Sequence, residues 1–513
     1  MHPEMALILL FTAATAVAIA ARRLKIPYTV ALVLAGLGLG ATRIIEGVHL
    51  TQALLYSVFL PGLLFEAAYH LKLSEFRENA KTILGLAVPG VLVAIGATAT
   101  LLVTTSNLGA VAGGFGWPHA LVFSAVIAAT DPIAVVSLFK SLGAPKRLAL
   151  LVEGESLVND GTSIVLFTIV YAAVRGGGIS VGAGILEFVE VVGLGLAIGA
   201  GVGFAASHVI QRIDDPMIEI TLTTIAAYGS FVAAEEFHVS GVIATVTAGI
   251  LCGNFAAPRG MGPATRIAVE SFWEYLAFAL NSLVFLLIGL EVQVSRLISE
   301  WRPILLAFVA VTAGRALVVF LVTALLRRTR EAVPWRWTLV LTWGGLRGAL
   351  SMVLALGVDA DFPYRELIVT MTFGVVLLSI VLQGVTAEPL LRVLNLIGGA
   401  SKRALFDVKR AELLASHAAL DALGKLEREH LAHGPVTREL RAEYERLSTA
   451  IETDVTQLYV EDANLRGEEL HAVRRHLLEV EKDAIVEAHR KGLIDGESRD
   501  RLRRAIDARI RTE

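Results

Sequence analysis

The sequence predicts an all-α polytopic membrane protein with about thirteen transmembrane helices, followed by a cytosolic helical C-terminal domain. Of its 513 residues 55% are hydrophobic, and the mean hydropathy is +0.65, which is too apolar for a soluble protein of this length. The composition changes after about residue 400, where charged residues become dense and leucines recur at helical spacing, as in Ala411–Leu423 and Leu470–Val486. We therefore expect a transmembrane domain over residues 1–395 and a cytosolic helical tail over 396–513, for which a regulatory role and a solvated tail without a ligand are the alternatives.

The transmembrane helices are predicted from thirteen stretches that are apolar over roughly 17–25 residues, the length that crosses a bilayer. Arg22, Arg23 and Lys25 follow the first stretch, whereas a cleaved signal peptide carries its basic residues before the apolar core. We therefore expect the first helix to be retained. The predicted spans are 4–21, 27–42, 50–69, 82–104, 119–139, 148–174, 179–208, 217–235, 239–255, 269–292, 303–326, 336–358 and 367–392.

The loops between these spans differ in their content of basic residues, which are enriched in cytoplasmic loops. If the N-terminus is outside, the inner loops carry Arg22, Arg23, Lys25, Lys72, Arg77, Lys81, Lys140, Lys146, Arg147, Arg212, Arg259, Arg266, Arg327, Arg328, Arg330 and Arg336. The outer loops then carry only Arg43, Arg175, Arg296, Arg302 and Arg365. This bias predicts an N-terminus outside the cell and a C-terminus in the cytoplasm.

Two of the predicted spans are interrupted at matching places in the chain. Thirteen spans allow two inverted repeats of six, linked by the seventh, so that the fifth and twelfth correspond. The fifth contains Ala129-Thr130-Asp131-Pro132, where the proline removes a helical hydrogen bond. The twelfth contains TWGGLRG over Thr342–Gly348. Either interruption alone could be a kink or a packing feature, but the pair predicts crossed broken helices around a transporter's binding site.

Glycine and cysteine patterns indicate close helix packing and argue against nucleotide binding and disulfides. Gly195, Gly199 and Gly203 recur every four residues in the seventh span, which predicts close packing against another helix. The glycines at positions 36, 38 and 40 lie in an apolar span with no strand before it, so we reject a nucleotide-binding loop there. The sequence contains no GxxxxGK[ST] motif, so nothing in it indicates an ATP-driven pump. The single cysteine, Cys252, excludes a disulfide framework.

The sixth span, around Leu148–Ile169, carries acids inside an apolar stretch. A charged side chain at the bilayer centre costs about 2.5–3.5 kcal/mol on insertion scales, so acids at this depth indicate a functional site. Helical periodicity puts Ser156, Asn159 and Asp160 on one face, with Glu155 one turn from Asn159. Such a cluster of oxygens suits a small hard cation or a proton. The alternative is a buried polar patch that only locks neighbouring helices together.

Polar groups from three other spans could converge on this face, namely Glu66, Thr130, Asp131 and Arg347. Carboxylate, hydroxyl and carbonyl oxygens suit sodium as they suit other hard cations. Arg347 needs a counter-charge in the membrane, for which Glu155 is the first choice and Glu153 the second. That pairing would leave Asp160 to bind either a proton or a cation. A second buried arginine, Arg315, is expected to form a structural pair with Glu291 or Glu274.

Four ordered motifs resemble the monovalent cation/proton antiporter superfamily, and most closely its asparagine–aspartate branch, the NhaP-type sodium/proton exchangers. The motifs are ATDP, EGESLVNDGTSIVLF, FWEYLAFALNSLVFLLIGLEV and GGLRGALS. The resemblance covers roughly residues 1–395, and the tail shows no such match. It implies a thirteen-helix fold with inverted six-helix repeats, a homodimer, and an elevator-like movement of a core domain against a dimer domain.

By motif position, the resemblance makes Asp160 the acid that binds sodium and protons alternately. It makes Asp131, Ser156 and Thr130 coligands of Na⁺, with Glu66 supporting the site through water. Asn159 would stabilise the site, and Glu155 would pair with Arg347. The branch with two consecutive aspartates is associated with electrogenic exchange, so the asparagine at position 159 favours electroneutral one-for-one exchange.

The expected function is therefore exchange of Na⁺ or Li⁺ for H⁺ across a plasma (inner) membrane, with no cofactor besides the transported ions and no nucleic-acid partner. A K⁺/H⁺ exchanger is the alternative, because a wider cavity would suit the larger ion. An ion channel fits paired broken helices less well. No HExxH motif or serine–base pair supports an intramembrane hydrolase, so we expect no enzyme. A membrane sensor acting through the tail is the remaining alternative.

Overall fold

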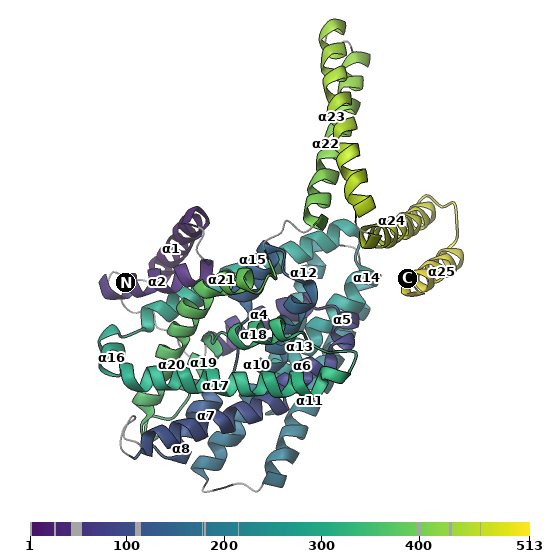
Figure 1. Ribbon diagram of the computed structural model, residues 1–513. Coiled ribbons are helices and arrows are strands. Elements are labelled where there is room, and N and C mark those ends of the chain that lie inside the picture. Colours follow the sequence, from purple (N-terminus) through teal and green to yellow (C-terminus); the bar gives the residue numbers. More distant parts are fainter. Residues whose placement is uncertain are drawn as a thin grey trace. The chain divides into compact units, whose positions relative to one another are not determined.

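The computed structural model describes residues 3–24, 27–42, 54–107, 114–176, 178, 181–213, 215–397, 402–429, 433–461 and 463–512. Over these residues the regular structure is entirely helical. The chain divides into two compact units, Met1–Leu396 and Ile397–Glu513, close to the predicted boundary after residue 395. We call them the membrane unit and the tail (Figure 1).

The membrane unit carries helices that are long and apolar enough to cross a bilayer. Among the described residues these are Ala80–Ser106, Lys146–Arg175, Gly182–Ile210, Pro216–Glu236, Ala264–Glu291, Trp301–Arg328 and Arg365–Val393. Shorter apolar helices lie at Ile8–Ala21, Tyr28–Gly40, Trp117–Val126 and Gly241–Ala256. The protein is therefore a multi-pass membrane protein. The first residues of two predicted spans, 50–53 and 179–180, lie outside the described residues.

Helices of the membrane unit pack mainly within two groups. The first bundle contains α1 (Pro3–Leu24), α2 (Tyr28–Thr42), η1 (Leu55–Phe59), α4 (Leu60–His70), α11 (Val181–Ile210), α12 (Pro216–Glu236), α13 (Gly241–Leu251), η2 (Cys252–Ala256), α14 (Ala257–Gly260) and α15 (Pro263–Glu291). Its strongest contacts join α2 to α15 and α13 to both α4 and α11. The bundle therefore joins helices from the start of the membrane unit's sequence to helices from its middle.

The second bundle contains the two interrupted spans. Its helices are α6 (Ala80–Ala87), α7 (Pro89–Asn107), α8 (Trp117–Val126), α9 (Ile133–Leu142), α10 (Lys146–Arg175), α17 (Trp301–Leu325), α18 (Trp335–Trp343), α19 (Ala349–Leu356), α20 (Arg365–Leu378), η4 (Ser379–Gln383) and α21 (Gly384–Val393). Three short helices, α5 (Leu73–Glu78), α16 (Val294–Ser299) and η3 (Leu326–Arg328), lie in the connections. Figure 1 shows α7, α8, α17 and α20 along one side of the unit.

Glycines allow the closest helix contacts, as the sequence predicts. A Cβ added to Gly199 of α11 would collide with the Ala244 carbonyl oxygen of α13. At Gly203 it would lie 3.0 Å from Ala248 Cα of α13, and at Gly195 it would lie 3.1 Å from the carbonyl oxygen of Ser240, the residue before α13. The small-residue pattern of the seventh span is thus confirmed as a packing surface, because side chains there would force the two backbones apart.

Both predicted helix breaks are present, and they contact each other. The fifth span consists of α8 and α9, joined by non-helical residues up to Pro132, which precedes the first turn of α9. The twelfth consists of α18 and α19, joined by Gly344–Gly348. Asp131 N donates a hydrogen bond of 2.8 Å to the Leu346 carbonyl. The breaks therefore share their freed backbone groups, which would be costly to leave unpaired in a membrane.

Arginines tie both ends of α10 to the rest of the second bundle. At the start of the helix, Arg147 donates to Asn79 Oδ1 at 2.7 Å and to the carbonyls of Glu331 and Ala332. At its end, Arg175 bonds Asp359 and Asp361 in the connection before α20. The helix that carries the predicted site is thus held to its own bundle at both ends.

The tail is built from α22 (Lys402–Arg428), α23 (Gly434–Glu461), α24 (Ala463–Arg490) and α25 (Gly496–Thr512). Figure 1 shows α22 and α23 lying side by side, and Phe406, Leu423 and Ile451 are buried in this unit. Ion pairs at Lys409–Asp454 (3.1 Å) and Arg441–Glu427 (2.8 Å) join the two helices. The predicted helices of the tail are present, but many of their apolar side chains, such as Leu414, Leu470 and Leu477, are exposed.

Candidate functional site

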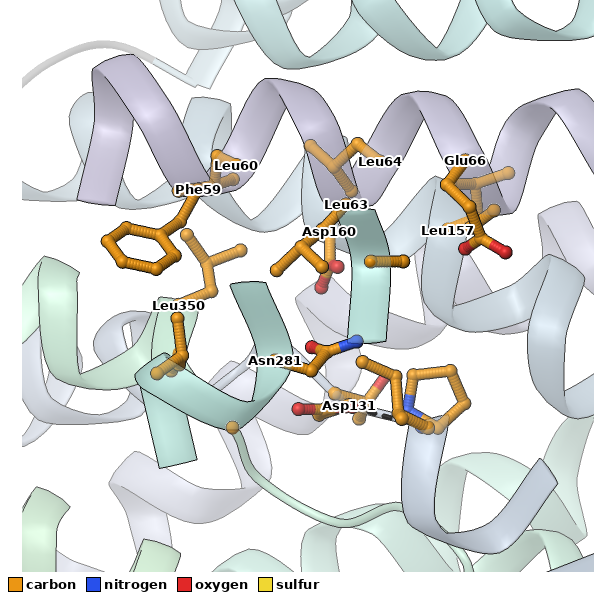
Figure 2. A pocket seen from close by; sticks show the side chains of 18 of the residues that line it. Phe59, Leu60, Leu63, Leu64, Glu66, Asp131, Leu157, Asp160, Asn281 and Leu350 are labelled. Atoms are coloured by element: carbon orange, nitrogen blue, oxygen red, sulfur yellow. Dashed lines mark hydrogen bonds between the residues drawn. The ribbon is translucent and has the colours of Figure 1, made fainter. Parts of the chain in front are cut away.

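A cavity of about 420 Å³ lies between the two bundles. The first bundle contributes apolar side chains of η1 and α4, together with Glu66 and, from α15, Asn281. The second bundle contributes the α8–α9 break, Asp160 of α10 and the start of α19. Figure 2 shows Asp160, Asn281 and Asp131 in the same region of the cavity, with Glu66 farther along α4 beside Leu157.

Hydrogen bonds among polar side chains at and behind the cavity wall hold the α8–α9 break against α10. Thr130 Oγ1 lies 3.0 Å from Ser156 Oγ and accepts a hydrogen bond of 2.9 Å from Asn159 Nδ2. The Asn159 amide also donates to the Ala128 carbonyl at 3.2 Å, and Ser156 Oγ donates to the Thr130 carbonyl. Ser163 donates to Asn159 Oδ1 at 2.5 Å. Asn159 thus braces the non-helical backbone next to Asp131.

The two aspartates of the predicted site both line the cavity. Asp131 Oδ1 accepts from the Ile133 amide at 3.0 Å, which orients the carboxylate at the start of α9. Asp160 Oδ1 is buried and accepts no hydrogen bond from any described residue. A buried carboxylate oxygen without a donor is costly, and a proton or a cation would satisfy it. Of the three predicted coligands, Asp131 and Thr130 line the cavity, whereas Ser156 lies behind it.

Gly348 permits the close approach of the second break to this site. A Cβ at position 348 would collide with Asp131 Cβ and come within 2.9 Å of its Cγ. Any larger residue would therefore displace the carboxylate or separate the two breaks. This requirement gives a physical reason for glycine in the GGLRGALS motif.

The predicted pair between Arg347 and Glu155 is wrong. Arg347 instead donates from one terminal nitrogen to the carbonyls of Ile127 (2.7 Å), Ala128 (2.8 Å) and Ala129 (3.1 Å). These carbonyls follow the C-terminal end of α8, where the helix carries partial negative charge and leaves acceptors unpaired. The partner of Arg347 is therefore the backbone of the broken helix, and not an acidic side chain as the sequence predicts.

Glu155 is paired with the other buried arginine, and this corrects the expectation that Arg315 pairs with Glu291 or Glu274. The Arg315 guanidinium bonds both carboxylate oxygens of Glu155, at 2.7 and 2.8 Å. It also donates to the Leu341 carbonyl near the end of α18. Each broken helix is thus capped by an arginine, Arg347 at α8 and Arg315 at α18. The second choice for Arg347, Glu153, lies 3.7 Å from Lys140 instead.

The family model for transmembrane sodium/hydrogen exchangers matches residues 7–393. This chain belongs to the sodium/hydrogen exchanger family. The match includes both broken helices, α10 and α15, so the four motifs that suggested the family lie within it.

Relatives within the family are named as antiporters. The chain is 38% identical to the Na⁺/H⁺ antiporter ApNhaP of Aphanothece halophytica over 77% of this chain and 74% of that protein. It is 34% identical to the Na⁺/H⁺ antiporter NhaG of Bacillus atrophaeus over 93% of this chain and 91% of that protein, so this likeness reaches into the tail. The fold resembles the sodium proton antiporter MjNhaP1 of Methanocaldococcus jannaschii, with a TM-score of 0.62 at 22% identity over 77% of this chain and all of that one.

Sequence reasoning did not place Asn281 in the site, and it assigned Glu274 to a structural pair with Arg315, but both line the cavity. Asn281 and Glu274 lie on α15, inside the FWEYLAFALNSLVFLLIGLEV motif that suggested the exchanger family. An amide in the middle of an apolar helix is the same kind of signal that singled out Asp160. Lys140 also lines the cavity, although the sequence placed it only among the inner-loop residues.

Proposed function

We propose that this protein exchanges Na⁺ for H⁺ across the membrane, with Asp160 as the acid that binds either ion. The observation that supports this most directly is the Asp160 oxygen that no described donor reaches, on the wall of a cavity that Asp131 and Thr130 also line. Carboxylate, hydroxyl and carbonyl oxygens form a donor set that suits a hard cation. The antiporter names of the relatives point to the same pair of ions.

The exchange follows from competition for one carboxylate. A proton or a sodium ion can neutralise Asp160, but the two cannot do so together. If the neutral forms cross between inward and outward states and the bare anion does not, each turnover moves one ion each way. Asn159 is neutral and its amide is committed to Thr130 and Ala128, so we infer electroneutral one-for-one exchange.

The wider arrangement is part of the same proposal. The chain would cross the membrane thirteen times as two inverted repeats, with the N-terminus outside and the C-terminus in the cytoplasm of a cell bounded by its plasma (inner) membrane. The second bundle would move against the first within a homodimer, in contact with membrane lipid. Residues 1–395 would form the antiporter and residues 396–513 a cytosolic tail. Ser156 and Glu66 would act as a ligand and a water-mediated support of the site.

Purified protein in proteoliposomes with a trapped pH dye tests the proposal. Na⁺, Li⁺ or K⁺ is added outside, and the wild type is compared with Asp160→Asn. We expect sodium-driven proton movement that is lost in Asp160→Asn but retained in Asp361→Asn, an identical change at an exposed aspartate away from the cavity. Clamping the potential with valinomycin and potassium should leave the rate of sodium exchange unchanged.

Other outcomes would point elsewhere. Proton movement with K⁺ alone would identify a potassium/proton exchanger, and a rate that follows the clamped potential would contradict one-for-one exchange. A protein that moves no ion under conditions where a known antiporter works would contradict the proposal. A chain that ends after Leu396 should still exchange ions, whereas a sensor acting through the tail would lose its output.

A further inference from the structure

A second hollow of about 420 Å³ adjoins the cavity on the side where the inner loops are predicted. Lys140 of α9 and Glu153 of α10 line both hollows. Their charged groups face each other, with Lys140 Nζ 3.7 Å from Glu153 Oε1. An ion that passes from the inner side to Asp160 through these hollows must therefore pass this pair.

The charged groups around the pair come from both bundles. On α4 of the first bundle, His70 Nδ1 lies 3.3 Å from Glu66 Oε1. Lys72 and Glu75 pair with each other at 3.0 Å at the rim of the outer hollow, where Lys146 also lies. Glu66 and Glu153 thus attract cations at the junction, and Lys140 is the lysine that reaches the inner cavity as well.

We propose that the Lys140 ammonium is a tethered competitor of the transported cation. It occupies Glu153 at the junction, and a sodium ion must displace it to reach Asp160. This inference rests on the proposed function and adds a residue that sets the apparent affinity from the inner side. Lys140 is not a ligand of the ion in this scheme. It acts through Glu153.

The exposure of the pair suits displacement. The Lys140 side chain is 67% exposed and the Glu153 side chain is 24% exposed, so water reaches the ammonium while the carboxylate is partly shielded. Ion pairs with one such exposed partner are weak, so a dissolved cation can compete with the lysine. Removing the lysine would leave Glu66 and Glu153 to concentrate cations in a narrow passage with low-dielectric walls.

The test measures sodium-dependent proton release in membrane vesicles whose cytoplasmic face is outward, from cells without other antiporters. Lys140→Gln should lower the apparent KM for Na⁺ about two- to fivefold, the range expected for an exposed ion pair, and should change kcat less than KM. Lys140→Arg keeps the charge and should keep the wild-type KM. Lys146→Gln removes the same charge from the outer hollow alone and serves as the matched control.

A double-mutant cycle with Glu153→Gln separates the pair from general surface charge. Glu153→Gln should raise the KM for Na⁺. In the Glu153→Gln background, Lys140→Gln should no longer lower this KM, because the lysine acts through Glu153. Equal effects of Lys140→Gln and Lys146→Gln, or an unchanged KM in Lys140→Gln, would overturn the inference. If the wild type itself moves no protons with sodium, the proposed function fails rather than this inference. Size-exclusion profiles that match the wild type exclude misfolding as the cause of any change.

Discussion

At the scale of single residues, two buried arginines stabilise the broken helices next to the candidate site. Arg347 satisfies three carbonyls near the end of α8, while Arg315 holds Glu155 with two hydrogen bonds and reaches the end of α18. The capped ends carry partial negative charge, which a buried guanidinium offsets. Both arginines are thereby bonded to groups other than Asp131 and Asp160, which suits the proposal that these aspartates exchange ions.

The Glu155–Arg315 pair gives a prediction at this scale. Both side chains are buried, so Glu155→Leu would strand an unpaired guanidinium and should destabilise the protein by about 3–5 kcal/mol. The double variant Glu155→Leu/Arg315→Met removes both charges and should recover most of that loss. Thermal unfolding of the detergent-purified variants measures both effects. A double variant no more stable than Glu155→Leu would contradict the argument.

The residues of the site could be predicted better than their partners. Asp160, Asp131 and Thr130 stand out in the sequence because polar groups are rare in spanning helices, and the cavity includes all three. The partner of Arg347 could not be read in the same way, because backbone carbonyls carry no sequence signature. Arg315 and Glu155 are 160 positions apart, so only the folded arrangement reveals that they meet.

The positions of helices could be predicted better than the pairs of residues that contact each other, because hydropathy, glycine and proline act on the local backbone. Glycines and a proline correctly mark both broken helices, since these residues alter the backbone wherever they stand. The six-residue helices α5 and α16 were not predicted, because each is too short for a periodic apolar face to show. The π-helical segments η1, η2 and η4 likewise have no sequence signal that we could identify.

Packing between α11 and α13 gives a prediction at the scale of elements. Gly199→Leu would drive a side chain into the α13 backbone and should destabilise the protein by at least about 1–3 kcal/mol, the usual cost of overpacking. Gly201, two positions along the same helix, has no neighbour within 4 Å of a built Cβ. Gly201→Leu is therefore the matched control and should unfold at nearly the wild-type temperature. Equal losses in both variants would indicate an effect on α11 alone.

The membrane unit as a whole should become less stable in acid, because the ion pairs of Arg175 with Asp359 and Asp361 weaken when these carboxylates take up protons. Hydrogen bonds from Arg175, and for Asp359 also from Tyr171, lower the pKa of Asp359 and Asp361. A carboxyl with a lowered folded-state pKa stabilises the fold above its unfolded pKa of about 3.9, and this contribution disappears as the pH falls through the folded value. The loss should therefore begin below about pH 5 and be complete below the folded pKa.

Unfolding temperatures of the wild type and of Asp359→Asn/Asp361→Asn, measured from pH 7 to pH 3, test this expectation. The wild type should be the more stable at pH 7, and the two curves should converge as the solution becomes acidic. Exchange at neutral pH should persist in the double variant, because both aspartates lie outside the cavity. Curves that stay parallel across the range would show that these aspartates do not link stability to pH.

Hydrogen bonds hold α10 to the second bundle at both ends, through Arg147 and Arg175, and in the middle, through Glu155. Asp131, Thr130, Asn159 and Asp160 all belong to one body, whereas the facing wall of α4 and α15 belongs to the other. If the second bundle moves against the first as we propose, the distances among these four residues stay unchanged. Under that proposal, substitutions in the first bundle would change the rate of transport without changing the residues that bind the ion.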